Sequence, residues 1–140
     1  MRDPAPGQGP LDARRVLVVE DEAIVAMLVE DGLAEAGAEV LGPAGSVEEA
    51  LRLIEAAVTE GGLSGAVLDI ALEGLGVAPV ADRLAALGVP FLFATGWAAN
   101  DGLAGGHAAP VLHKPFGPHA LVAAVAALTR ARREDPPLRA

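Results

Sequence analysis

The chain contains no cysteine and no tyrosine, and aromatic residues make up only 3% of it. The absence of cysteine excludes disulfides, thiol catalysis and zinc sites built on thiolates. Basic residues are scarce as well: ten Lys and Arg stand against nineteen Asp and Glu, which gives a formal net charge of -9. Nucleic-acid-binding domains are normally basic, and anionic membrane surfaces attract basic segments, so we expect neither partner.

Long hydrophobic runs are also missing. The N-terminal sequence "MRDPAPGQGP" has no apolar segment of the kind found in secretory signals. Gly88, Pro90 and Gly96 interrupt the uncharged run over residues 84–100, so this run does not predict a membrane span. We therefore expect a cytoplasmic protein. With 140 residues, of which 52% are hydrophobic, the chain has the length and apolar content of one folded domain.

Short apolar runs alternate along the chain with segments of helical periodicity. This alternation predicts an α/β fold, in which helices cover both faces of a parallel sheet. The three glycines that follow Trp97 predict at most a short or loose helix before the last strand. The expected strands are residues 15–20, 38–42, 65–70, 90–95 and 110–113, and the expected helices are residues 21–36, 46–59, 77–87 and 118–133. We expect residues 14–132 to form the domain, with flexible segments over residues 1–13 and 133–140.

Polar residues stand where the predicted strands end. Glu20 and Asp21 follow the first strand, Asp69 lies near the end of the third, Thr95 ends the fourth, and Lys114 follows the fifth. Ligands of open parallel sheets bind at the carboxyl ends of the strands, so we expect these five residues to converge on one edge.

The chemistry of this set fits phosphoryl transfer. Carboxylates that lie close together repel one another, and oxygen ligands of this kind suit Mg²⁺. A carboxylate can attack a phosphoryl group, while a lysine and a hydroxyl hold the phosphoryl oxygens. Each residue alone also has a plain structural interpretation: Thr95 as a strand end, Asp21 as a helix N-cap, and Lys114 as a surface residue. Glu22 is interpreted as a solvated residue of the first helical turn.

Four fragments of the sequence, "VLVVEDE", "AVLDI", "FATG" and "HKPF", resemble the marks of the receiver domain of two-component response regulators. The resemblance covers residues 14–132. It implies a flavodoxin-like (βα)5 fold with the strand order 2-1-3-4-5. The stretch around "FATGW" also resembles a subgroup with a Phe-Ala-Thr-Gly stretch, many members of which are single-domain proteins partnered with histidine kinases of the HWE or HisKA-2 type.

The resemblance also implies residue roles. Asp69 would accept the phosphoryl group, Asp21 would bind Mg²⁺ directly, and Glu20 would bind it mostly through water. The backbone carbonyl of Ala71 would complete the protein ligands of the metal. Thr95 and Lys114 would each bind a phosphoryl oxygen, and the peptide bond from Lys114 to Pro115 would be cis.

The implied function is that of a single-domain response regulator. It would accept a phosphoryl group from a histidine kinase or a phosphotransferase, and would act through protein contacts or as a phosphate sink. Apart from its own phosphorylation and slow dephosphorylation it would not be an enzyme, and we expect a monomer or a weak homodimer. The alternative is a degenerate receiver that binds a partner without phosphorylation. A hydrolase or phosphatase would need a substrate pocket and a general acid, and a flavin-binding module would need a phosphate-binding loop; the sequence indicates none of these.

Three positions depart from the family pattern. Val111 stands where an aromatic switch residue is usual, which leaves the coupling to activation open. Ala71 offers no polar side chain near Asp69, and the bulky Trp97 follows two residues after Thr95. We therefore hypothesise that the acyl phosphate is shielded and long-lived.

The three histidines, His107, His113 and His119, do not have the spacing of a helical ligand pair, so a zinc site is disfavoured.

Overall fold

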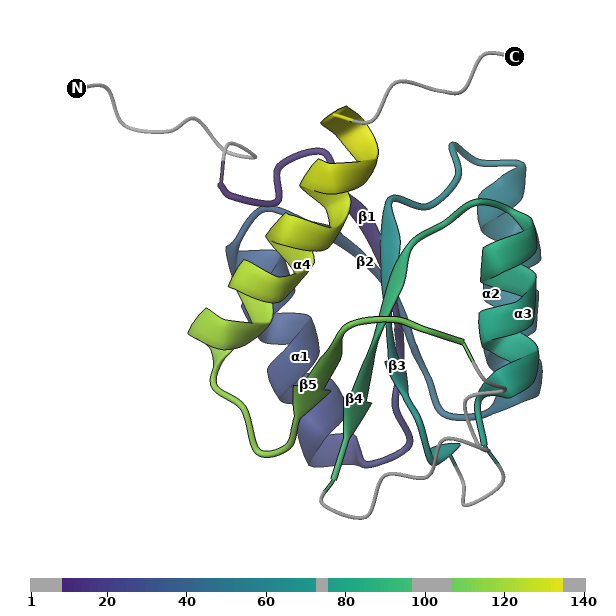
Figure 1. The fold of residues 1–140 in the computed structure, drawn as a ribbon, viewed down its shortest axis with the longest axis horizontal. Helices are drawn as coiled ribbons and strands as arrows, with labels where there is room; N and C mark the ends of the chain where they lie inside the picture. The colour runs from purple at the N-terminus through teal and green to yellow at the C-terminus, as the bar shows by residue number, and fades with distance from the viewer. Residues whose placement is uncertain (1–8, 73–75, 97–106, 135–140) are drawn as a thin grey trace.

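The computed structural model describes residues 9–72, 76–96 and 107–134 (Figure 1). Each predicted strand and helix is present within a few residues of its expected bounds. The loose helix expected after Trp97 falls on residues 97–106, which lie outside the described residues. The elements are β1 (Arg15–Val19), α1 (Ala23–Glu35), β2 (Glu39–Ala44), α2 (Val47–Val58), β3 (Gly65–Asp69), α3 (Ala78–Ala86), β4 (Phe91–Thr95), β5 (Val111–His113) and α4 (Pro118–Glu134).

The five strands form one parallel sheet with the order β2-β1-β3-β4-β5, as predicted. Figure 1 shows α1 and α4 against one face of the sheet and α2 and α3 against the other. The order of the strands reverses between β1 and β3, so their carboxyl ends flank the topological switch point, where ligands of this architecture bind. Within the described residues, no helix is long and apolar enough to cross a membrane.

The core lies on both faces of the sheet, because successive side chains of a strand point in opposite directions. Leu17 and Leu68 pack with α2 and α3, whereas Val18 and Val67 pack with α1 and α4. All four side chains are buried. Burial on both faces fixes the register of β1 and β3, and with it the place where each strand ends.

The segment before β1 contributes to this core. Leu11 is fully buried, and its backbone N–H donates a hydrogen bond to the carbonyl of Ala36 at 2.8 Å. This position falls within residues 1–13, where we expected flexibility. The packed unit therefore extends to Leu11, because a leucine in the loop before β1 closes the end of the core beside α1.

Helix α2 begins with a side-chain cap at Ser46. Ser46 Oγ accepts a hydrogen bond from the backbone N–H of Glu49 at 3.1 Å, and the Glu49 carboxylate accepts one from the N–H of Gly45 at 3.1 Å. The first of these bonds satisfies a backbone donor that the first turn of a helix leaves free, and the second holds the Glu49 side chain against the residue before the cap.

Replacing the cap should destabilise the fold. We expect Ser46→Ala to lower the free energy of unfolding by about 1 kcal/mol, because Ala cannot accept the hydrogen bond from Glu49. Ser46→Asp should keep the stability of the natural protein, since aspartate caps as well as serine. Urea unfolding of the three proteins provides the measurement, and equal losses for Ala and Asp would contradict a capping role.

Candidate functional site

The register of the sheet brings the predicted polar residues to one edge. Val19 in β1 pairs with Leu68 in β3, so the residues that follow them, Glu20 and Asp69, become neighbours. Asp69 pairs on its other side with Ala94 in β4, the strand that ends at Thr95. The backbone N–H of Lys114 in turn donates a hydrogen bond to the Thr95 carbonyl at 2.7 Å. Parallel pairing therefore aligns the strand ends that carry the site.

Three carboxylates form an acidic cluster, which we define as Glu20, Asp21 and Asp69. One oxygen from each lies within 4.8 Å of the others. Glu20 and Asp69 are only 4% and 6% exposed, whereas Asp21 is exposed. Backbone groups orient the two buried members: the N–H of Glu22 donates to Glu20 Oε2 at 3.0 Å, and the N–H of Ala71 donates to Asp69 Oδ1 at 3.2 Å. Such a set of hard oxygen donors fits a divalent cation such as Mg²⁺.

The ammonium group of Lys114 places a positive charge beside this cluster. Its Nζ lies 2.9 Å from Glu20 Oε1 and 3.7 Å from Asp69 Oδ1. It also lies 3.2 Å from Glu22 Oε1, so Glu22 is an ion-pair partner and not the merely solvated residue that we predicted. Burial lowers the pKa of Lys114, but its contacts with the three carboxylates outweigh burial and hold the pKa above its ordinary value.

The carboxyl group of Asp69 has a strongly raised pKa. Burial, the negative charge of Glu20 and a hydrogen bond with Asp21 raise it from 3.8 to about 7, against the opposing effects of Lys114 and the Ala71 N–H. One lysine therefore does not compensate for the crowding of carboxylates around Asp69.

Thr95 ends β4 inside the protein, with only 1% of its surface exposed. Its hydroxyl donates to the carbonyl of Gly96 at 3.1 Å. The peptide bond between Lys114 and Pro115 is cis, as predicted, and a second cis bond that we did not predict joins Gly42 to Pro43. The N-cap residue of α1 is Glu22, so the interpretation of Asp21 as the N-cap is wrong.

The other residues singled out in the sequence are Val111, Trp97 and the three histidines. Val111 is 47% exposed on β5, and Trp97 lies outside the described residues. His107 Nε2 lies 2.6 Å from Asp82 Oδ1, whereas His113 is exposed. His119 is exposed as well.

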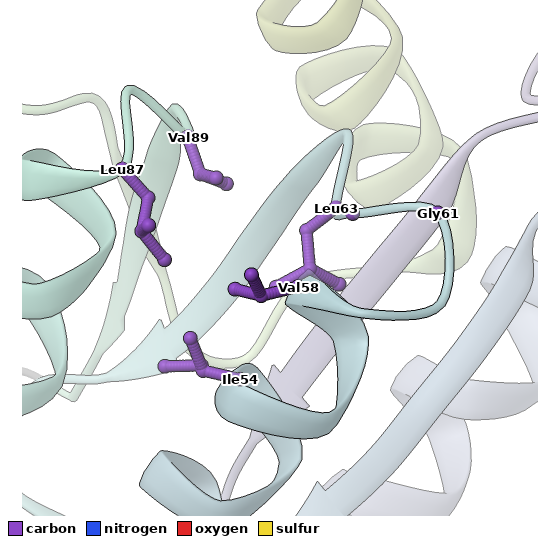
Figure 2. Close-up of a pocket in the computed structure, with 7 residues that line it drawn as sticks. Ile54, Val58, Gly61, Leu63, Leu87 and Val89 are labelled. Carbon is purple, nitrogen blue, oxygen red and sulfur yellow. The ribbon is translucent and has the colours of Figure 1, made fainter.

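A separate pocket of about 240 Å³ opens between the carboxyl ends of α2 and α3 (Figure 2). Leu63 and Val89, which line it, precede β3 and β4, so the pocket lies at the amino edge of the sheet, opposite the acidic cluster. Its lining carries no ionisable side chain and therefore offers no group for phosphoryl chemistry. The lining residues are Ile54, Val58, Gly61, Gly62, Leu63, Leu87 and Val89.

The raised pKa of Asp69 predicts that this carboxylate destabilises the metal-free protein. A carboxyl pKa of about 7 in the folded state, against an ordinary value of 3.8, means that the folded state holds the proton more tightly than the unfolded state. Stability is therefore lost as the pH rises from about 4 to about 7. Asparagine does not ionise and keeps the acceptor for the Ala71 N–H, so Asp69→Asn should be more stable than the natural protein by about 2 kcal/mol above pH 7.

The measurement is urea unfolding in EDTA at several pH values, with Asp31→Asn on the exposed surface of α1 as the control for net charge. The advantage of Asp69→Asn should shrink toward zero near pH 4. An advantage that is constant between pH 4 and pH 8 would contradict the assignment.

The chain is similar to several solved structures. SdrG from Sphingomonas melonis Fr1 is 38% identical, with a TM-score of 0.65, over 82% of this chain and 95% of SdrG. A response regulator receiver protein from Sinorhizobium medicae WSM419 is 31% identical, with a TM-score of 0.67, over 87% of this chain and 98% of that protein. The response regulator PhyR from Brucella abortus is 26% identical, with a TM-score of 0.71, over 86% of this chain but 49% of PhyR.

No family model and no curated protein matches the chain. The identities to solved structures nevertheless extend over almost the full length of two relatives, and TM-scores of 0.65 and 0.67 show that the fold is shared. The chain belongs to the response regulator receiver family.

Proposed function

We propose that this receiver domain takes up a phosphoryl group on Asp69 from a phosphohistidine, with Mg²⁺ bound at the acidic cluster. One observation carries the proposal: a buried carboxylate at the end of β3 lies among two other carboxylates and 3.7 Å from a lysine ammonium. The donor would be a histidine kinase or a phosphotransferase. The Phe-Ala-Thr-Gly stretch that ends β4 is the reason to consider kinases of the HWE or HisKA-2 type first.

In the proposed step, a carboxylate oxygen of Asp69 forms a bond to phosphorus while the bond from phosphorus to the histidine nitrogen breaks. The imidazole leaves with the electron pair of that bond and can take up a proton. Asp69 must be ionised to attack, so its raised pKa opposes the reaction in the metal-free protein.

Glu20, Asp21, Asp69 and the carbonyl of Ala71 would hold the metal. When bound, Mg²⁺ would neutralise the crowded carboxylates and the charge on the phosphoryl oxygens.

Two further residues would bind the transferred group. Lys114 is a positive point charge at the site, and its ammonium would pair with a phosphoryl oxygen. The Thr95 hydroxyl donates to the Gly96 carbonyl, and we propose that a phosphoryl oxygen replaces this acceptor. Both residues would stabilise charge that spreads over the phosphoryl oxygens during transfer.

The phosphorylated protein would signal through contacts with another protein or would drain phosphoryl groups from its kinase. A receiver that bound its partner without phosphorylation would not require a buried carboxylate that destabilises the fold. The raised pKa of Asp69 therefore favours the phosphorylated mode of action over the degenerate one.

Intact mass spectrometry tests this proposal. Phosphoramidate is a suitable donor because it contains a phosphorus–nitrogen bond, as phosphohistidine does. With Mg²⁺ present, we expect the natural protein and the Asp31→Asn control to gain one phosphoryl group and Asp69→Asn to gain none. EDTA should abolish the gain, because the carboxylates would then repel the incoming group. An equal gain in Asp69→Asn and the natural protein would contradict the assignment of the acceptor.

A further inference from the structure

Lys114 has a carboxylate partner that does not belong to the acidic cluster. Its ammonium lies 2.9 Å from Glu20 and 3.2 Å from Glu22, but 3.7 Å from Asp69. The lysine therefore lies nearer to two glutamates than to the proposed acceptor. Of these glutamates, Glu20 is buried and shares the proposed metal site, whereas the side chain of Glu22 is 64% exposed and lies outside it.

The side chain of Glu22 contacts Lys114 and does not cap the helix that it precedes. Glu22 is the N-cap residue of α1, yet its side chain makes no capping hydrogen bond. Shorter side chains such as Ser, Asp or Asn are preferred at an N-cap because they reach back to the helix. The longer side chain of Glu22 reaches Lys114 instead, which lies 92 residues away in the sequence. Its backbone N–H donates to Glu20, which ties the residue to the site.

We propose that Glu22 competes with the phosphoryl group for the Lys114 ammonium and thereby weakens the phosphorylated state. This inference rests on the proposed function. A phosphoryl group on Asp69 would need the ammonium to leave its closer contacts and approach the end of β3. The contact with Glu20 would loosen when the metal neutralises that carboxylate, but Glu22 is not a member of the metal site and would keep its attraction for the lysine. Glu22 thus sets how strongly the site holds a phosphoryl group.

The expected gain in affinity is small because the side chain of Glu22 is largely exposed to solvent. Ion pairs in which one partner is largely solvated are weak, so removing the competitor should strengthen the binding of a phosphoryl-like anion by about two- to fivefold. The competition depends on reach as well as charge. Glu22→Asp keeps the charge but shortens the side chain by one methylene, whereas Glu22→Gln keeps the length but removes the charge.

The test is calorimetric titration with beryllofluoride, an anion that resembles a phosphoryl group, in saturating Mg²⁺. We expect Glu22→Asp and Glu22→Gln both to bind it about two- to fivefold more tightly than the natural protein. Asp31→Asn, which removes a charge further along α1, should bind it as the natural protein does.

Two results would overturn the inference alone: unchanged affinity in both Glu22 variants, or a gain in Glu22→Gln without one in Glu22→Asp, which would indicate general charge repulsion. A natural protein that binds neither Mg²⁺ nor beryllofluoride would overturn the proposed function, and this inference with it.

Discussion

The crowding of Glu20, Asp21 and Asp69 beside the ammonium of Lys114 is the constraint on which the rest of the site depends. Glu20 and Asp69 are both buried, and each is placed by the end of a strand that cannot shift without disturbing the core. Their repulsion cannot be relieved by rotation into solvent, so Asp69 holds its proton up to a pH of about 7. A bound cation would relieve this repulsion, and in the proposed function it would favour the ionised form of Asp69 that attacks phosphorus.

The sheet supplies this arrangement without any local motif that binds phosphate. Parallel pairing of β1, β3 and β4 aligns three strand ends, and the reversal of strand order between β1 and β3 leaves their carboxyl ends open to a ligand. The strand register that buries the core residues also places the residues of the candidate site. The side chains just before the site, such as Leu68, are buried, and burial of this kind holds the charged groups at their positions against the repulsion between them.

The fold was predictable from the sequence because its strands are apolar on both faces and its helices have clear ends. The five residues at the strand ends were predictable for the same reason: an apolar run that ends on Asp69 or Thr95 places a polar group at a known edge. The ion pair of Glu22 with Lys114 was not predictable, because it depends on how far a long side chain reaches across 92 residues of sequence. Burial of Leu11 was missed because a single leucine among glycine and proline has no periodicity to indicate which way it faces.

The release of protons on Mg²⁺ binding tests the central claim most directly. At pH 7 a carboxyl group with a pKa of about 7 is close to half protonated, and a metal that binds to it must displace that proton. Titration calorimetry in buffers of different ionisation enthalpy measures the number of protons released. The account predicts a release of about half a proton per Mg²⁺ bound by the natural protein at pH 7 and none by Asp69→Asn. Binding of Mg²⁺ with equal proton release in both proteins would contradict it.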